Sequence, residues 1–287
     1  MRLATVLADG EARVGIIDAE AGRVDVLDGH GGMLDLIEAW AEVRDTLVVS
    51  RDWRPFRPET LLAPIPVPRR NLFCVGKNYR AHAREFAASG YDAGAAAGGD
   101  LDPFPAVFTK PPSTVVGPGA VVPLHRHVTR QVDYEAELAV IIGRPGRDIP
   151  REAALDHVFG YAILNDVTAR DRQRDHRQWF LGKALDGFCP MGPWITTADE
   201  VDAGALDIRC WVNGDLRQAA NTRDLIFDIP SLIATLSAGL TLQAGDIIAT
   251  GTPAGVGVGF DPPRFLSPGD RVRIEIGGLG VLENGFG

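Results

Sequence analysis

At residues 132–142 the chain reads "VDYEAELAVII", a stretch rich in strand-forming residues. Side chains of a strand point the same way at every second position, so one face carries three carboxylates, those of Asp133, Glu135 and Glu137. The other face is apolar and consists of Tyr134, Ala136, Leu138, Val140 and Ile142. A half-buried strand often turns its polar face to water. Here the acidic face continues into Ala139 and Ile141, which predicts that carboxylates lie near a core and need a cation.

The composition is that of a globular protein of 287 residues, with 45% hydrophobic and 23% charged residues. The chain has no apolar run of the roughly 20 residues that span a membrane, and its first residues lack a signal-peptide pattern. We therefore expect a cytoplasmic protein without a membrane partner. The net charge of -9 argues against nucleic acid. The widely spaced Cys74, Cys189 and Cys210 are typical of core residues, not of a disulfide framework or a zinc site.

Lysine is rare in this chain. Only Lys77, Lys110 and Lys183 occur among 29 basic residues, so 29 − 3 = 26 are arginines. Each lysine stands in a segment rich in Gly, Pro or aromatic residues, unlike an exposed helix face. We interpret these lysines as places where a compact ammonium group is needed, although chance retention stays an alternative.

The first 62 residues predict a small α/β domain. Strands are expected at residues 2–8, 12–18 and 22–28, followed by an amphipathic helix over about 33–48. A proline-rich segment, residues 54–70, predicts a linker. We therefore place a domain boundary there, with domains over 1–62 and 63–287.

The second part predicts a β-rich domain with few helices, not a series of βαβ units. A strand over 71–76 leads to a short helix that ends at Gly90, followed by a Gly/Ala-rich segment, 91–105, expected to be a mobile loop. The helix and the loop could form a lid. Further along we expect a helix over 151–157, a strand from 158 that ends near Asp166, a hairpin turn at Asn213-Gly214, and a helix in the second part of 225–242.

Three acidic residues are candidates for a metal site. Glu135, Glu137 and Asp166 offer oxygen ligands only, which suit Mg²⁺ or Mn²⁺, with Ca²⁺ possible in vitro, better than zinc. Three carboxylates leave coordination positions for water and a chelating substrate. This pattern favours a catalytic metal over a structural one.

Five motifs over residues 70–285 together resemble the fumarylacetoacetate hydrolase family. They are the E-x-E strand, "NDVTARD", "GKNYRAHAREF", "NGDLRQAANTRDLIF" and the pair "GKALDGFCPMGPW" and "TGTPAGVG". Within the family, the chain resembles the acylpyruvase-like and 2-hydroxyhepta-2,4-diene-1,7-dioate isomerase-like branch. The resemblance implies an α+β fold with a mixed β-roll catalytic domain, preceded by the small N-terminal domain, and a homodimer.

The resemblance also assigns site residues. It implies that Glu135, Glu137 and Asp166 hold the metal, that Asp133 is not a ligand, and that the metal chelates a 2-oxo acid or 1,3-dicarbonyl substrate. His82 and Glu85, which are neighbours on one helix face by their i,i+3 spacing, become a dyad in which Glu85 orients the imidazole that deprotonates water. Lys183 would meet negative charge developing on the substrate. The implied substrate contacts are Gln173, Thr252, Gly251 and Tyr79.

Simpler interpretations exist for several of these residues. His82 and Glu85 could be a surface pair, and Lys183 could form a salt bridge with Asp186. Gly251 and Gly255 could merely permit tight turns instead of contacting an oxyanion.

The sequence-based hypothesis is a metal-dependent hydrolase that cleaves a C–C bond in an acylpyruvate-like β-diketo acid. The first alternative uses the same metal and enolate for oxaloacetate decarboxylation, or for isomerisation or dehydration of a 2-hydroxy-dienoate. Residues that line the lid, chiefly Phe86, Tyr91 and the loop to Phe104, would separate these reactions. The second alternative is a catalytically silent relative that binds a metabolite or dimerises.

Overall fold

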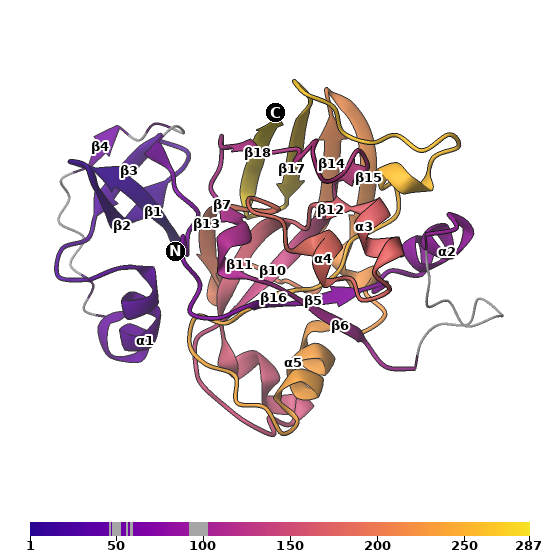
Figure 1. Ribbon diagram of the computed structural model, residues 1–287. Coiled ribbons are helices and arrows are strands. Elements are labelled where there is room, and N and C mark those ends of the chain that lie inside the picture. Colours follow the sequence, from indigo (N-terminus) through magenta and orange to yellow (C-terminus); the bar gives the residue numbers. More distant parts are fainter. Residues whose placement is uncertain (46, 48–52, 56, 58–59, 92–102) are drawn as a thin grey trace.

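The computed structural model describes the whole chain except residues 46, 48–52, 56, 58–59 and 92–102. Most of the expected loop over 91–105 therefore lies outside the described residues. None of the helices in the described part is long and apolar enough to cross a membrane. Figure 1 shows the N-terminal strands and the first helix at one end of the molecule, and the helix over residues 80–88 at the other.

Strands in the described part form one large mixed sheet. Its members are β1 (Arg2–Ala8), β2 (Glu11–Asp18), β3 (Arg23–Val26), β4 (Arg54–Pro55), β5 (Leu72–Gly76), β6 (Ala106–Lys110), β7 (Val115–Val116), β10 (Ala136–Ile142), β11 (Val158–Asn165), β13 (Cys189–Thr197) and β16 (Ile247–Ala249). The order across the sheet is β4-β3-β2-β1-β13-β11-β10-β16-β5-β6, and β7 pairs with β13. Antiparallel pairs dominate, but β16 runs parallel to β5, as does β7 to β13.

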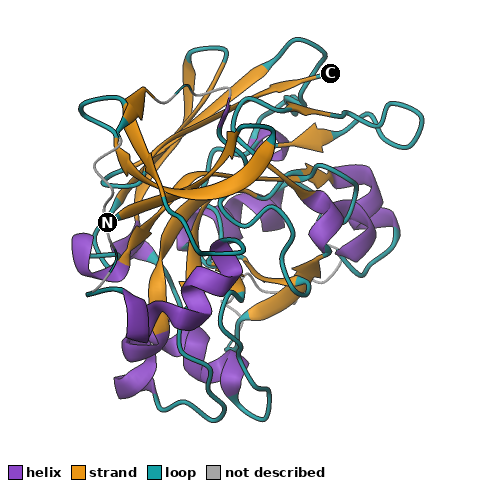
Figure 2. Ribbon diagram, turned by 90° about the vertical axis from the view of Figure 1, so that its left-hand side faces the viewer, coloured by secondary structure: helices purple, strands orange, loops and turns teal. Residues whose placement is uncertain are grey.

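Two smaller sheets complete the roll. One contains β8 (Val121–Val122), β14 (Asp207–Val212), β15 (Asp215–Asn221), β17 (Arg271–Ile276) and β18 (Gly280–Phe286), and the other pairs β9 (Val132–Asp133) with β12 (Thr168–Ala169). The expected hairpin is confirmed: β14 and β15 meet at Asn213 and Gly214, whose φ angles of 53° and 87° are those of a tight hairpin turn. Figure 2 shows how the strands curve over one another, with helices below and beside them.

The helices in the described part of the chain are short. The α-helices are α1 (Met33–Val43), α2 (Arg80–Ala88), α3 (Arg170–Asp175), α4 (Phe180–Lys183) and α5 (Ile229–Ser237). The 3-10 helices are η2 (Pro112–Thr114), η3 (Arg151–His157), η4 (Ala198–Glu200), η5 (Thr222–Asp224) and η6 (Gly257–Gly259). One expectation needs correction: the helix expected over 33–48 ends at Val43. The helix expected over 151–157 is confirmed and is a 3-10 helix. The predicted α+β class with mixed sheets is confirmed.

Strand β10 is buried on both faces, as its sequence predicted. Leu138 and Val140 belong to the core between the large sheet and the five-stranded sheet. Ala139 and Ile141 face the opposite way, into a second core that includes Leu36 of α1. The acidic face of the strand therefore continues into apolar surroundings, and the interpretation of these carboxylates as a solvated face is wrong.

The stretch over 132–142 is not one continuous strand, contrary to expectation. β9 pairs with β12, whereas β10 pairs with β11, so the chain changes partners at residues 134 and 135. Side-chain amides replace ladder partners at this break: Glu135 N donates to Asn165 Oδ1 and Ala136 N donates to Gln218 Oε1. The break separates Asp133 from the two glutamates.

The N-terminal region is joined to the rest by main-chain pairing. Leu3 of β1 lies opposite Ile195 of β13, and Trp40 of α1 packs edge-to-face on Phe159, with 5.0 Å between ring centroids. One sheet therefore crosses the proposed boundary, and the division into 1–62 and 63–287 stays a prediction.

Candidate active site and metal centre

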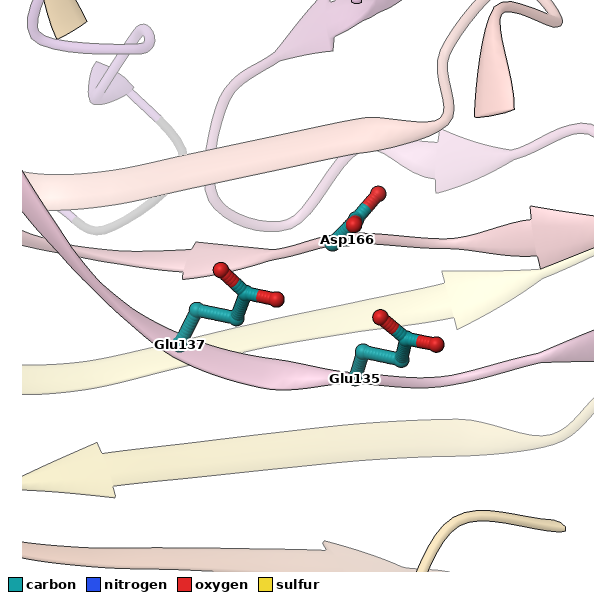
Figure 3. A group of neighbouring side chains, drawn as sticks. All are labelled: Glu135, Glu137 and Asp166. Carbon is teal, nitrogen blue, oxygen red and sulfur yellow. The ribbon is translucent and has the colours of Figure 1, made fainter. Parts of the chain in front are cut away.

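Three carboxylates meet at the end of the β10–β11 pair. Glu135, Glu137 and Asp166 each offer an oxygen, and these atoms lie within 4.8 Å of one another (Figure 3). Asp166 directly follows β11, and its N–H donates to the Glu135 carbonyl oxygen at 2.8 Å. The strand register thus brings together residues that are about thirty positions apart, and all three side chains are buried.

Two of the carboxylates have buried cationic partners. Lys183 Nζ lies 2.8 Å from Glu135 Oε2 and 2.7 Å from Asp166 Oδ2. Lys110 Nζ lies 2.9 Å from Asp166 Oδ1, and Arg170 Nη2 lies 2.6 Å from Glu135 Oε1. Burial alone would raise the pKa of Glu135, but Lys183 and Arg170 outweigh it and lower that pKa to about 2. Glu135 is therefore ionised at neutral pH.

Glu137 has a different environment. Its Oε2 accepts a hydrogen bond from Gly251 N at 2.8 Å. Burial raises its pKa well above the usual range, and the negative charges of Asp166 and Glu135 raise it further. A divalent cation among the three oxygens would remove this repulsion. The donor set therefore fits a hard dication such as Mg²⁺ or Mn²⁺.

All three lysines of the chain lie around one cavity, as the lysine bias suggested. Lys77 and Lys183 line it, and Lys110 lies behind Asp166. Lys110 is completely buried and also donates to the carbonyl oxygens of Val167 and Phe188, at 3.0 and 2.7 Å. The alternative in which Lys183 pairs with Asp186 is wrong, because its ammonium group contacts the carboxylate cluster.

His82 and Glu85 contact each other as predicted, and His82 faces the same cavity. His82 Nδ1 lies 3.2 Å from Glu85 Oε2 on α2, and His82 lines the cavity together with Glu135 and Glu137. Glu85 Oε1 accepts a further bond from Gly255 N at 2.9 Å. A proton held on Nδ1 by Glu85 leaves Nε2 as an acceptor. His82 is 4% exposed, so the surface-pair interpretation is wrong.

The four residues predicted to bind substrate divide into two groups. Gln173 and Thr252 line the cavity. The Gly251 N–H is used on Glu137 instead. Tyr79 is buried and lines a neighbouring cavity with Arg223. The contacts of all four with a substrate stay predictions.

Sequence reasoning missed Arg170, a buried cation that contacts three other side chains. Its Nε lies 2.8 Å from Asp133 Oδ2 and its Nη1 lies 3.1 Å from Gln173 Oε1, in addition to the contact with Glu135. The guanidinium also lies over the Phe86 ring, 5.6 Å from its centroid. Among so many arginines, the motif "NDVTARD" offered no local sign that this one is buried.

Aromatic side chains cover the rest of the cavity. Phe86, Phe108 and Trp179 line it. Lys183 Nζ lies 4.9 Å from the Phe108 ring centroid. Of the lid residues expected to influence the reaction, Phe86 lines the cavity, whereas Tyr91 does not. An apolar cover strengthens the electrostatic interactions beneath it.

A comparison with known families identifies the catalytic part. Residues 71–286 match the family described as "Fumarylacetoacetate (FAA) hydrolase C-terminal". The chain belongs to the fumarylacetoacetate hydrolase family. The resemblance inferred from the five motifs is confirmed, and the match covers the carboxylates, the dyad and Lys183.

Relatives within the family carry different activities in their names. Oxaloacetate tautomerase YisK of Bacillus subtilis is 52% identical over 228 residues, which cover 79% of this chain and 73% of the relative. Among solved structures, a fumarylacetoacetate hydrolase of Exiguobacterium antarcticum is 42% identical with a TM-score of 0.87, covering 100% of this chain and 99% of its own. Maleylpyruvate hydrolase of Sphingobium sp. SYK-6, in complex with manganese(II) and pyruvate, is 36% identical with a TM-score of 0.76 and coverage of 100% and 98%.

Proposed function

We propose that this member of the family catalyses keto–enol chemistry on a short 2-oxo dicarboxylic acid of the oxaloacetate type, namely tautomerisation with or without decarboxylation. One observation carries the proposal: His82, which contacts Glu85, lines the same aromatic-covered cavity as Glu135 and Glu137 of the carboxylate cluster. Such a site can move a proton next to a carbonyl group while negative charge is stabilised close by.

Each residue has a part in this chemistry. Nε2 of His82 would take a proton from the carbon next to the 2-oxo group and return it to oxygen, with Glu85 holding the ring and stabilising its protonated form. Lys183 and Arg170 supply positive charge beside the developing enolate. Gln173 and Thr252 would hold the carboxylate end of the substrate. A Mg²⁺ or Mn²⁺ ion bound by Glu135, Glu137 and Asp166 would supply Lewis-acid polarisation of the 2-oxo group.

One relative supports keto–enol chemistry as the first candidate function. It is 52% identical over 228 residues and is named an oxaloacetate tautomerase. In our proposal, keto–enol chemistry therefore comes ahead of hydrolysis.

Hydrolysis of an acylpyruvate-like β-diketo acid is the second candidate function. In that reaction His82 would deprotonate a water molecule, which would attack the distal carbonyl group, and C–C cleavage would release a pyruvate-type enolate. The support is a maleylpyruvate hydrolase with the same fold, solved with manganese(II) and pyruvate.

A substrate panel tests both proposals. Purified protein loaded with Mn²⁺ is given oxaloacetate and acetylpyruvate in turn, and loss of enol absorbance and release of pyruvate are followed. We expect the faster turnover on oxaloacetate, and an excess of acetylpyruvate cleavage would favour the hydrolase. Metal-dependent stabilisation without turnover on either compound would support the catalytically silent alternative.

A histidine variant identifies the base. We expect His82→Gln to lower kcat by about 10²–10⁴-fold, the usual contribution of general acid–base catalysis, while Mn²⁺ binding is retained. His127→Gln, at an exposed histidine outside the cavity, is the matched control. Full turnover by His82→Gln would contradict the assignment.

The proposal also includes the homodimer and the cytoplasmic location expected from the sequence. Light scattering of the purified protein tests whether it is a dimer.

A further inference from the structure

Asp133 is a buried carboxylate that the family resemblance leaves without a role. Its side chain is 0% exposed and accepts four hydrogen bonds. Oδ1 accepts from Tyr134 N at 2.9 Å and Gly257 N at 2.6 Å, and Oδ2 accepts from Arg170 Nε at 2.8 Å and Val258 N at 3.0 Å. A carboxylate has about four acceptor positions, so all of them are used.

One end of this arrangement reaches the carboxylate cluster. With its Nε held by Asp133, Arg170 directs Nη2 at Glu135 and Nη1 at Gln173, at 2.6 and 3.1 Å. The planar guanidinium group has a fixed fork geometry. Fixing Nε therefore fixes the direction of the other nitrogens in the cavity.

Two of the remaining contacts of Asp133 are with η6, the 3-10 helix that packs against α2. Gly257 and Val258 belong to η6, and Val258 packs with Val256 against Phe86 of α2. A Cβ atom at Gly259 would collide with the Glu85 side chain, so this segment lies directly against the dyad. The main-chain segment that donates hydrogen bonds to Asp133 is thus the one that packs against Glu85 and Phe86.

We propose that Asp133 is a positioning residue that fixes the Arg170 guanidinium and the α2 dyad relative to each other. This inference rests on the proposed function for its kinetic consequences, but not for its structural ones. The Asp133 carboxylate thus bonds both to Arg170, which lines the cavity, and to η6, which packs against the helix that carries His82. Its effect on the reaction is exerted through Arg170 and η6, because Asp133 itself does not line the cavity.

An amide cannot replace the carboxylate. Asparagine at this position would present an NH₂ group to two of the four N–H donors, because every donor contact is already made to an oxygen. The variant would therefore lose hydrogen bonds to Arg170, to the main chain of η6, or to both. The isosteric Asp133→Asn substitution therefore tests the role of the carboxylate with little change in volume.

The experiment compares Asp133→Asn with the wild type in the Mn²⁺-loaded full-length protein. We expect kcat/KM on oxaloacetate to fall by about 10–100-fold, as is usual when the group that orients a metal-site residue is lost. We also expect amide hydrogen exchange in the 256–259 segment to accelerate by about 10-fold or more, because charge-assisted bonds are broken. Mn²⁺ titration should give a dissociation constant within about 10-fold of the wild type, since no ligand is changed.

Asp246→Asn is the matched control. Asp246 is also a buried aspartate, 5% exposed, whose Oδ1 accepts from Arg70 Nε at 2.8 Å and whose Oδ2 accepts from Gln243 N at 2.6 Å. Neither it nor Arg70 lines the cavity. This variant should lose thermal stability while kcat and the exchange of 256–259 stay at the wild-type values.

Arg170→Lys separates the two ends and serves if Asp133→Asn does not fold. It breaks the Nε contact but leaves Asp133 to accept from Gly257 and Val258, so kcat/KM should fall by about 10-fold or more without faster exchange at 256–259. Wild-type kcat/KM in either Asp133→Asn or Arg170→Lys would overturn the proposal, as would equal loss of kcat in Asp246→Asn. If the wild type turns over neither substrate, the proposed function fails, and unchanged exchange in Asp133→Asn would still overturn the positioning role.

Discussion

Glu137→Gln separates metal binding from folding at the carboxylate cluster. The substitution keeps the shape of the side chain, and its amide oxygen can still accept from Gly251 N, but one of the three carboxyl groups whose oxygens lie within 4.8 Å becomes a neutral amide that cannot ionise. A ligand present at about 100 times its Kd stabilises the folded state by about 2.7 kcal/mol. At about 2.1 cal/mol/K per residue, 287 residues give an unfolding entropy of about 0.6 kcal/mol/K. The wild-type Tm should therefore rise by about 4–5 °C with saturating Mn²⁺.

The variant should lose most of that shift. If loss of the charged ligand weakens Mn²⁺ binding about 100-fold, the same concentration equals the new Kd, and the stabilisation falls to about 0.4 kcal/mol, or less than about 1 °C. Differential scanning fluorimetry with and without Mn²⁺ measures both shifts. Glu85→Gln is the control, because its carboxylate lies beside the same cavity but outside the cluster. A shift of 4–5 °C retained by Glu137→Gln would refute the assignment of the metal site.

Without metal, we expect Glu137→Gln to be more stable than the wild type at neutral pH. The folded-state pKa of Glu137 is raised above its ordinary value of 4.5 by burial, Asp166 and Glu135. The folded protein then binds a proton that the unfolded chain releases, so this contribution to stability is complete below pH 4.5 and is lost as the pH rises through the folded pKa. In EDTA, Glu137→Gln should therefore gain in Tm relative to the wild type between pH 5 and pH 8. A constant difference across this range would contradict the raised pKa.

Three other substitutions test the framework of the site. Asn78 lies just before α2, and its side chain forms hydrogen bonds with the main chain of Phe227 and Thr250. Asn78→Ala should therefore lower the free energy of unfolding, measured by urea denaturation, by about 2–3 kcal/mol. A loss below about 0.5 kcal/mol would contradict this prediction. Gly255 has a φ of 104°, and Gly255→Ala would place a Cβ atom against the Arg217 carbonyl oxygen. Turnover should therefore fall by about 10-fold or more, and the Tm should drop. Wild-type turnover and Tm would show that the turn adapts to the methyl group. Asp228→Ala removes the N-cap of α5 and should cost about 1 kcal/mol with unchanged kcat, measured by thermal melts and assay; altered kcat would be unexpected.

The amino-acid sequence by itself determined the local geometry of the site. Strand periodicity placed Glu135 and Glu137 on one face, and helix periodicity placed Glu85 one turn from His82. The scarcity of lysine pointed to Lys110 and Lys183 before any contact was known. These inferences succeeded because a side chain's direction depends on the period of its own element, which neighbouring residues specify.

Contacts between distant segments were decided only by the tertiary structure. The partner change between β9 and β10 sends Asp133 to Arg170 and η6, although its strand parity grouped it with the two glutamates. Likewise, Gly251 N–H is bound to a carboxylate, and β1 joins the catalytic sheet through β13. Which strands pair, and which buried donor meets which acceptor, depends on packing across the whole chain, and no local period encodes it.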